Sequence, residues 1–274
     1  MALHPDDFRY ICEFIREAAA IVLEPGKEYL VDTRLSPVAT QCGLGDIAGV
    51  VRELRRSRHS PVAQKVVDAL TTNETSFFRD LAPYQHLRQR VIPALMEARK
   101  NERTLDIWCG AASSGQEPFS MLMMMREDFP QLASWKVRFI ATDISQVMLA
   151  RCREGVYSQL EVNRGLPAPL LVKYFKKQGI DWQIDESLRK SVEWREFNLV
   201  GHAWSTLPSM DLIMLRNVMI YFDVPTKRGI LANIRRVLRP DGYLFLGTAE
   251  TTINVDESFQ SEQVQSSCYR VKAA

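Results

Sequence analysis

The sequence contains no long apolar run and no secretion signal, and these absences exclude two classes of protein. Nowhere in its 274 residues does an apolar stretch approach the roughly 18 residues that a membrane-spanning helix needs. The start of the chain, from Met1 to Asp7, lacks the basic and then apolar segments of a signal peptide. We therefore expect a cytoplasmic protein that does not insert into a membrane.

Cysteine is sparse and unpaired, and the net charge is small. The five cysteines form no Cys-x-x-Cys motif: Cys12, Cys42, Cys109, Cys152 and Cys268. This pattern is typical of reduced thiols and predicts neither a disulfide framework nor a metal site. A formal net charge of +2 does not by itself indicate nucleic-acid binding. With 46% hydrophobic and 25% charged residues, the chain has the composition of an enzyme of one or two domains.

The first 100 residues have the apolar spacing of helices, and we predict an all-helical N-terminal domain over residues 1–88. Apolar side chains recur at three- and four-residue steps from Phe8 to Val22. Further helices are predicted from Asp46, from Pro61 and, as a long fourth helix, from Leu81 to Leu95. No strand-like alternation competes with this pattern.

The helix predicted near residues 46–59 has one apolar and one cationic face. Its basic side chains are Arg52, Arg55, Arg56 and His59, with Arg58 and Lys65 nearby. A solvated helix face accounts for such a stripe, and usually contributes little.

From Thr104 onward, short apolar runs alternate with helical segments, which predicts a doubly wound α/β domain over residues 89–274. The predicted strands are 105–108, 137–141, 212–215 and 243–246, and the predicted helices are 117–128, 145–153 and 225–238. Residues 157–197 interrupt this rhythm. A helix over 167–178 ends at Gly179, and alternating apolar residues then flank the turn 185–187. We interpret the interruption as a small antiparallel β insertion.

The segment 105–118 runs from a strand through a small-residue loop into a proline-opened helix, as in nucleotide-binding folds. The spacing of Gly110 and Gly115 fits a P-loop, but Gln116 and Glu117 stand where lysine and a hydroxyl residue belong. Glu117 would repel phosphates, whereas it could accept from an ammonium group. S-adenosylmethionine has an amino group and a sulfonium but no phosphate, so the loop suits it better than ATP or NAD.

Asp143 follows the second predicted strand, where an acidic residue can accept both hydroxyls of a ribose. The alternative role of Asp143 is to cap the next helix, although Ser145 could supply that cap instead. Together the loop and Asp143 favour an adenosine-containing cofactor.

Further motifs follow in order: Thr72–Asp80 (TNETSFFRD), Gly115–Ser120 (GQEPFS), Ala141–Ile144 (ATDI), Phe197–Leu199 (FNL), Leu215–Phe222 (LRNVMIYF) and Leu238–Gly247 (LRPDGYLFLG). This series resembles the CheR-type chemotaxis-receptor glutamate methyltransferases over nearly the whole chain. Gln116, Phe119 and Cys109 depart from the commoner residues of that family. The resemblance implies a class I (Rossmann-like) S-adenosylmethionine-dependent methyltransferase domain with a small antiparallel β insertion and an all-helical N-terminal domain.

The resemblance also implies a set of site residues. Those expected to bind the cofactor are Asn73, Thr75, Arg79, Glu117, Asp143, Asn198, Leu199, Arg216 and Asn217. Arg79 and Tyr221 are expected to orient the substrate carboxylate. Without the family, Asn73 and Thr75 could be helix caps, Arg79 a surface ion pair and Asn198 a strand-end turn.

The expected reaction is transfer of a methyl group to receptor glutamates, which gives methyl esters and S-adenosylhomocysteine. A glutamate, with a pKa of about 4.3, is already an anion at neutral pH, so alignment rather than a general base should dominate catalysis. The expected partner is the cytoplasmic helical region of receptors in membrane arrays, held by Arg52, Arg55, Arg56 and Arg58. The β insertion either holds a receptor C-terminal tail or only covers the cofactor cleft. Rival hypotheses are a small-molecule or nucleic-acid methyltransferase and a sensor without turnover.

Overall fold

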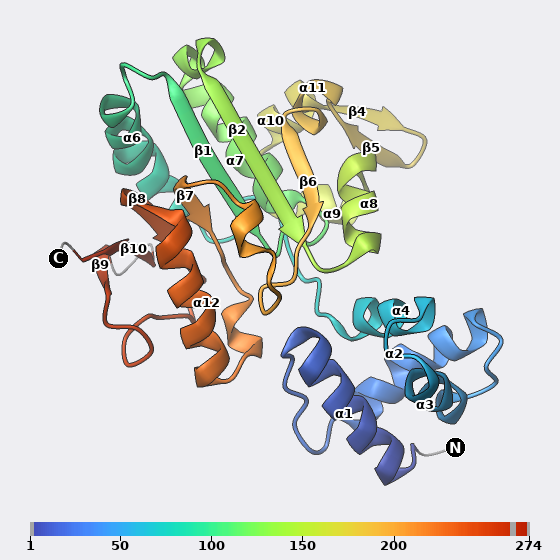
Figure 1. Ribbon diagram of the computed structural model, residues 1–274. Helices are drawn as coiled ribbons and strands as arrows, with labels where there is room; N and C mark the ends of the chain where they lie inside the picture. The colour runs from blue at the N-terminus through green and yellow to red at the C-terminus, as the bar shows by residue number, and fades with distance from the viewer. Residues whose placement is uncertain (1–2, 264–266, 273–274) are drawn as a thin grey trace. The chain divides into compact units, whose positions relative to one another are not determined.

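A computed structural model describes residues 3–263 and 267–272 (Figure 1). The chain divides into two compact units. One comprises Met1–Thr72 with Tyr221–Thr226, and the other comprises Asn73–Ile220 with Lys227–Ala274. The helical unit therefore ends before residue 88, where we predicted its boundary. The physical reason is that Phe77, Phe78 and Tyr84 pack in the core of the larger unit.

The smaller unit contains four helices, α1 (Pro5–Ala19), α2 (Glu28–Gln41), α3 (Ile47–Arg56) and α4 (Pro61–Leu70). Asp46 and Ser60 cap α3 and α4 by accepting backbone N–H groups. The sequence pattern did not predict α2, which has Pro37 in its interior and buries Val31, Leu35, Val38 and Ala39. The stripe predicted to reach Val22 ends earlier, because Ala20 adopts a left-handed conformation and stops α1.

The larger unit is built on a seven-stranded sheet of order β6-β2-β1-β7-β8-β10-β9. Its strands are β1 (Thr104–Gly110), β2 (Lys136–Asp143), β6 (Val192–Glu196), β7 (Met210–Met214), β8 (Leu238–Phe245), β9 (Phe259–Gln263) and β10 (Cys268–Val271). Neighbouring strands from β6 to β8 are parallel, whereas β10 pairs antiparallel with β8 and β9. The four strands predicted from apolar runs are confirmed.

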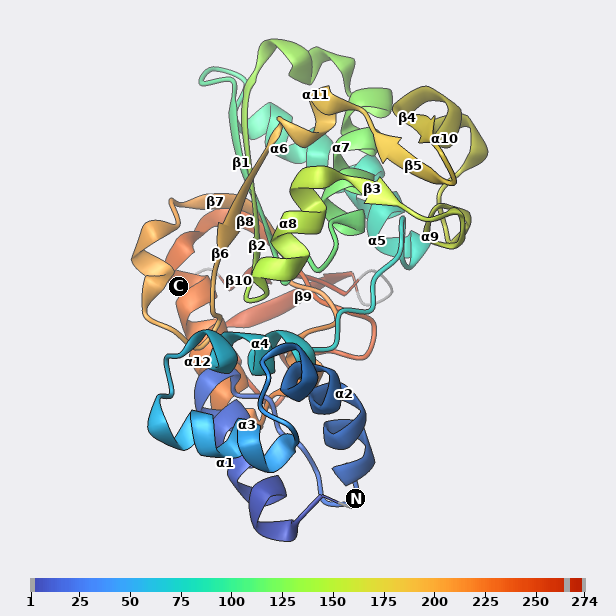
Figure 2. The ribbon, with the colours of Figure 1, turned by 90° about the vertical axis from the view of Figure 1, so that its right-hand side faces the viewer.

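Helices cover both faces of this sheet, as Figures 1 and 2 show for α7 (Gln116–Asp128) and α12 (Val224–Val237). The helix predicted from Leu81 is one continuous helical segment with a π-helical middle: α5 (Leu81–His86), η1 (Leu87–Val91) and α6 (Ile92–Ala98). α8 (Gln146–Glu154) packs on β2 and β6. Short 3₁₀ turns are η2 (Pro130–Ser134), η3 (Ala203–Thr206) and η4 (Met219–Tyr221).

A second, three-stranded antiparallel sheet has the order β3-β5-β4 (Figure 2). It consists of β3 (Val156–Tyr157), β4 (Phe175–Gln178) and β5 (Asp181–Ile184), with α9 (Gln159–Asn163), α10 (Ala168–Tyr174) and α11 (Glu186–Arg189) beside it. Two details of the predicted insertion over 157–197 need correction. The helix predicted to reach 178 ends at Tyr174, and residues 192–196 form β6, which pairs parallel with β2 in the main sheet. Alternation indicates a strand, but not which strand it pairs with.

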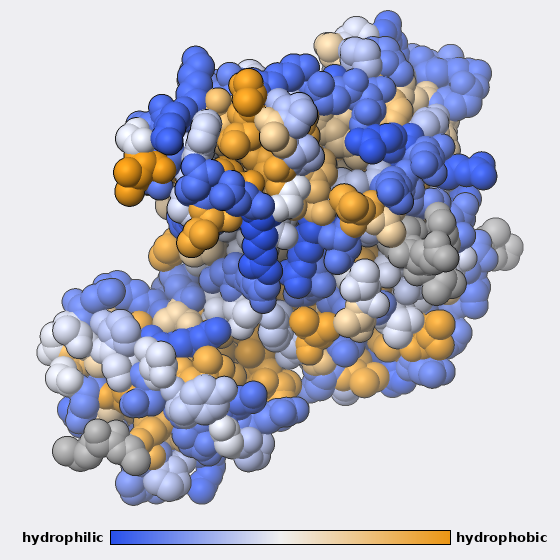
Figure 3. Space-filling model, turned by 180° about the vertical axis from the view of Figure 1, so that it is seen from behind, coloured by the Kyte–Doolittle hydropathy of each residue, from blue (hydrophilic) through white to orange (hydrophobic). Residues whose placement is uncertain are grey.

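The two faces of β1 bury different clusters. Leu105, Ile107 and Cys109 belong to the core cluster that includes α7, whereas Trp108 contacts Phe197 and Trp204 edge to face. Figure 3 shows that the rear surface also gathers some hydrophobic side chains among hydrophilic ones. Within residues 3–263 and 267–272, no helix is long and apolar enough to cross a membrane.

Candidate active site

The loop after β1 has an unusual backbone that small residues make possible. Ala111, Ser113 and Gly115 have positive φ angles of 53°, 50° and 92°. A Cβ atom on Gly115 would lie 3.0 Å from the Cys152 sulfur and 3.2 Å from the Tyr157 hydroxyl oxygen. The Tyr157 hydroxyl also donates to the Ser114 carbonyl at 2.7 Å. The loop is therefore held in one shape, and it leads directly into the first turn of α7.

Asp143 lies at the end of β2, beside this loop. The parallel register pairs Gly110 with Thr142, so the carboxyl ends of β1 and β2 lie next to each other. Asp143 is buried, and its carboxylate accepts the N–H of Ser113 at 2.7 Å and that of Ser145 at 2.8 Å. The side chain of Ser145, not that of Asp143, caps α8 by accepting the N–H of Met148. An acidic group thus already accepts an N–H of the loop, which disfavours a phosphate there.

Glu117 stands in the first turn of α7 with only 8% of its surface exposed. One carboxylate oxygen accepts from the guanidinium of Arg216, and the other accepts from the Cys109 thiol at 3.4 Å. Burial raises the pKa of Cys109 well above its usual value, and the Glu117 charge raises it further, so the thiol stays protonated. Because a carboxylate has about four acceptor positions, Glu117 can still accept from a ligand amino group.

Arg216 follows β7, and its guanidinium forms hydrogen bonds with other residues of the protein. Beyond Glu117, it donates to the Arg79 carbonyl at 2.9 Å and to the Asp80 carboxylate at 2.8 Å. Burial disfavours its charge, but the Glu117 and Asp80 carboxylates outweigh that cost and raise the pKa of Arg216. Its side chain is 1% exposed. Arg216 therefore holds the Glu117 carboxylate in place, and its expected contact with the cofactor stays a prediction.

The segment 73–80 runs along the same site. The Ser113 hydroxyl donates to the Asn73 carbonyl at 2.9 Å, and the Phe78 N–H donates to the Ser120 hydroxyl at 2.9 Å. Thr71 ends α4 and Asp80 precedes α5 as the cap residues, so neither Asn73 nor Thr75 is a helix cap. Arg79 is half-buried, and its guanidinium donates to the Glu74 carbonyl at 2.9 Å. Phe77 and Phe78 are buried packing residues.

Asn198 and Leu199 follow β6 in a tight turn. The Asn198 side chain accepts the N–H of Val200 at 3.1 Å, and the Trp204 indole donates to the Leu199 carbonyl at 3.2 Å. The Phe197 N–H donates to the Asp143 carbonyl at 3.0 Å, which ties this turn to the end of β2. The turn therefore has the strand-end role that we weighed for Asn198, at a position beside Asp143.

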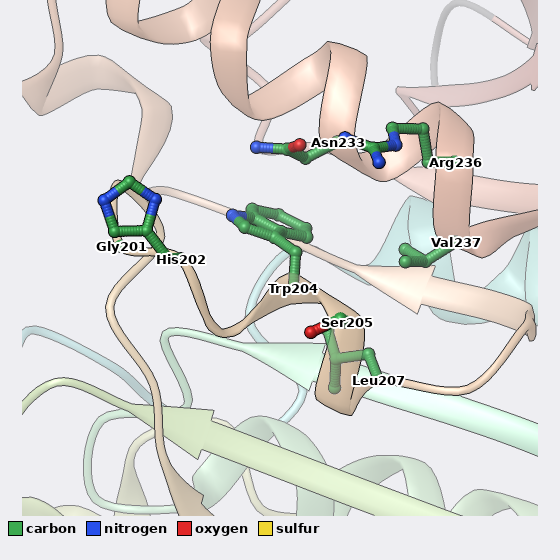
Figure 4. A pocket seen from close by; sticks show the side chains of 8 residues that line it. All are labelled: Gly201, His202, Trp204, Ser205, Leu207, Asn233, Arg236 and Val237. Atoms are coloured by element: carbon green, nitrogen blue, oxygen red, sulfur yellow. The ribbon is translucent and has the colours of Figure 1, made fainter.

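A pocket of about 400 Å³ lies beside Trp204, between η3 and α12. Figure 4 shows the Trp204 ring in its middle, with Asn233 and Arg236 projecting from α12. None of the residues predicted to bind the cofactor lines this pocket. It is therefore distinct from the predicted cofactor site.

Asn217 follows Arg216 in a left-handed conformation, with a φ of 59°. Its N–H donates to the carboxylate of Glu250, a buried residue that our sequence reasoning missed. The signal was present, since Glu250 follows the last predicted strand by a few residues, much as Asp143 follows the second. Tyr221 belongs to the segment 221–226, which groups with the helical unit. Its expected catalytic role stays a prediction.

The basic residues predicted for receptor binding lie on and just after α3, and all four are exposed: Arg52, Arg55, Arg56 and Arg58. Arg56 pairs with Glu53 at 3.0 Å, and Arg58 pairs with Glu17. The guanidinium carbon of Arg55 lies 4.6 Å from the centre of the Tyr10 ring. Arg52 has no ion pair within the described part of the chain. Two of the four charges are thus partly neutralised within the unit.

The doubly wound sheet, the small-residue loop and the acidic residues after β1 and β2 define a class I S-adenosylmethionine-dependent methyltransferase. Comparison with known proteins agrees. The family described as CheR methyltransferase, SAM binding domain matches residues 73–268, and the CheR methyltransferase, all-alpha domain matches residues 6–71. The chain belongs to the CheR methyltransferase family, which confirms the resemblance, the fold class and the cofactor.

Curated relatives match along most of their length. Chemotaxis protein methyltransferase 1 of Pseudomonas aeruginosa is 39% identical, and the match covers 94% of each chain. Chemotaxis protein methyltransferase Cher2 of Pseudomonas putida is 36% identical, again over 94% of each chain. A solved structure of the glycopeptide N-methyltransferase MtfA with S-adenosyl-L-homocysteine is 16% identical, with a TM-score of 0.34 over 68% of this chain and 60% of that one. Within the described residues, no group of three His, Cys, Asp or Glu side chains is arranged to hold a metal ion.

Proposed function

We propose that this chain transfers the methyl group of S-adenosylmethionine to glutamate side chains of chemotaxis receptors and releases glutamyl methyl esters and S-adenosylhomocysteine. The observation that supports this best is the joining of the family's signature segment to the cofactor loop. Ser113 donates to the Asn73 carbonyl, and Arg216 links Glu117 to the carbonyl of Arg79. The signature segment of this family, with Asn73 and Arg79, is thus hydrogen-bonded to residues at the cofactor loop that are typical of the wider class.

The residues present fit the cofactor by their charge and size. Asp143 would hold the ribose and Glu117 the amino group, while Asn198 and Leu199 would contact the adenine. Asn73, Thr75, Arg79, Arg216 and Asn217 would complete the site, with Arg216 acting through Glu117. When bound, the cofactor supplies an electrophilic methyl group on a sulfonium. Two carboxylates near a small-residue loop suit a ligand with a cationic end and no phosphate.

Alignment is the main task of the protein in this reaction, because the substrate carboxylate needs no deprotonation at neutral pH. Arg79 and Tyr221 are the candidates for orienting it. The guanidinium of Arg79 uses one nitrogen on the Glu74 carbonyl, and its planar fork has further donors for a carboxylate. Such a contact also draws charge from the nucleophile, so Arg79 should help substrate binding more than the chemical step.

Two surfaces are candidates for receptor contact. The exposed Arg52, Arg55, Arg56 and Arg58 would attract the acidic surroundings of target glutamates and so recruit the enzyme to membrane receptor arrays. In the small sheet, β3 and β4 are the two edges, and an edge strand can pair with an extended receptor tail. Exposed Leu160, Val172 and Ile180 on and around this sheet would favour such a contact.

The test is incubation with methyl-labelled S-adenosylmethionine and receptor-bearing membranes, followed by alkali and collection of volatile label. Release as methanol would identify carboxyl methyl esters, because methylated nitrogen does not hydrolyse under these conditions. A matched reaction with Asp143→Asn should lose cofactor affinity and label together. Tight binding of S-adenosylhomocysteine without methanol from any receptor would refute the proposed reaction and favour a sensor or another substrate.

A further inference from the structure

Glu250 occupies a position between the two loops that leave β7 and β8. Its carboxylate accepts three backbone N–H groups, from Asn217 at 2.9 Å, from Gly247 at 2.5 Å and from Ile220 at 3.2 Å. The residue is only 7% exposed. A carboxylate with three such donors is held in one orientation, and in turn fixes the backbone of both loops.

Contact between the two loops is close at Gly247. A Cβ atom there would lie 2.7 Å from the side-chain nitrogen of Asn217, 2.8 Å from its backbone nitrogen and 2.8 Å from a Glu250 carboxylate oxygen. Only a residue without a side chain lets Asn217 and Glu250 approach in this way. Asn217 also has a positive φ of 59°, a conformation that the surrounding structure must maintain.

We infer that Glu250 is a positioning residue for methyl transfer, which sets the backbone and side chain of Asn217 at the cofactor site. This inference rests on the proposed function, because Asn217 is placed at the cofactor only there. Glu250 acts through Asn217, whose N–H its carboxylate accepts.

Glu250→Gln tests this role with almost no change in size. The amide keeps one acceptor oxygen but turns an NH₂ group toward backbone donors, so at least one of the three bonds is lost. We expect the Kd of S-adenosylhomocysteine to rise about tenfold, the effect of one well-placed hydrogen bond. The KM for receptor should stay near that of the wild type. Amide NMR signals of Asn217, Gly247 and Ile220 should move upfield as their bonds to the carboxylate weaken.

Two further variants make the result decisive. Gly247→Ala disturbs the same contact from the opposite side and should weaken S-adenosylhomocysteine binding in the same direction; it decides the matter if Glu250→Gln does not fold. Glu257→Gln is the matched control, since Glu257 accepts the N–H of Asn254 at 3.1 Å in an exposed turn of the same segment. It should leave the Kd unchanged.

The outcomes separate the inference from the proposed function. A folded Glu250→Gln variant with shifted amide signals but a Kd within about twofold of wild type would overturn the positioning role. If wild-type protein does not bind S-adenosylhomocysteine at all, the proposed function fails first and the inference fails with it. Weak binding in both Glu250→Gln and Gly247→Ala, with normal binding in the wild type and in Glu257→Gln, would support it.

Discussion

Arg216 and Glu117 form a buried ion pair at the carboxyl edge of the sheet, with the Arg216 side chain 1% exposed and that of Glu117 11% exposed. The pair joins Arg216, which follows β7, to the first turn of α7, and Arg216 also donates to the Asp80 carboxylate and the Arg79 carbonyl. A buried pair of this kind gains little net stability, but removal of one partner leaves the other charge uncompensated.

Arg216→Met should therefore destabilise the protein by about 3–5 kcal/mol and weaken cofactor binding. The physical reason is that Glu117 would either keep an unpaired buried charge or take up a proton. Urea unfolding at pH 7 measures the first effect, and titration calorimetry with S-adenosylhomocysteine measures the second. The control is Arg88→Met, which breaks a half-exposed pair with Asp128 and should cost no more than about 1 kcal/mol. Equal losses for the two variants would contradict this account.

Gly115→Ala should distort the loop after β1. The backbone there has a φ of 92°, and the added methyl group would crowd Cys152, Phe119 and Tyr157. We expect a loss of about 1–3 kcal/mol in the free energy of unfolding, with weaker S-adenosylhomocysteine binding. Gly179→Ala separates strain from crowding, because Gly179 also has a positive φ but no atom within 4 Å of the added group. That variant should lose some stability while its cofactor affinity stays normal.

Local patterns were sufficient to predict four strands of the main sheet and the acidic residues that follow the first two, Glu117 and Asp143. Leu105, Ile107 and Trp108 are apolar because both faces of β1 are buried, and the same property placed Asp143 at a strand end. The alternative role of Asp143 was to cap α8. Ser145 fills that role instead, because its hydroxyl accepts the N–H of Met148. Glu117 was identified from its charge at a helix start.

Features that depend on distant parts of the chain could not be derived in this way. Periodicity shows that 192–196 is a strand, but its parallel pairing with β2 depends on which edge of the main sheet is open. The role of Arg216 depends on Glu117, which lies 99 residues away in sequence. Likewise, its place after the last predicted strand marks Glu250 as a candidate, but the sequence does not reveal that backbone N–H groups of Asn217, Gly247 and Ile220 converge on its carboxylate.

A second network of ion pairs lies near the amino ends of the strands. It should make the free energy of unfolding depend on pH in the acidic range. Arg99 donates to the buried Asp211 at 2.8 Å and to Asp241 at 2.6 Å. The hydrogen bond from Arg99 lowers the pKa of Asp241 in the folded protein. A lowered folded-state pKa contributes stability above the unfolded pKa of about 3.9, and that contribution is lost as the pH falls through the folded pKa.

Asp241→Asn should thus lower the free energy of unfolding at pH 7 by up to about 1 kcal/mol, since Asp241 is half-exposed, and by less at pH 3. Urea unfolding at both pH values measures the difference. The Arg99→Met background supplies the check: without Arg99, Asp241→Asn should have nearly the same small effect at both pH values. A pH-independent loss in the presence of Arg99 would show that the ion pair is not its cause.

Charge reversal on α3 should distinguish a receptor-binding surface from a solvated helix face. Arg52 and Arg55 are the best targets, because Glu53 and Glu17 already partly neutralise Arg56 and Arg58. We expect Arg52→Glu with Arg55→Glu to raise the KM for receptor severalfold at low salt and less at high salt, where screening weakens steering. The kcat and the Kd of S-adenosylhomocysteine should stay normal.

The matched control for this prediction reverses two exposed lysines at the amino ends of the strands, Lys100→Glu with Lys136→Glu. It changes the net charge of the protein by the same amount, so it removes any general attraction without touching α3. If both double variants raise the KM equally, overall charge is responsible and α3 has no special role. A rise confined to the α3 variant, and reduced by salt, would place the receptor on the helical unit, since only local positive charge then accounts for the difference.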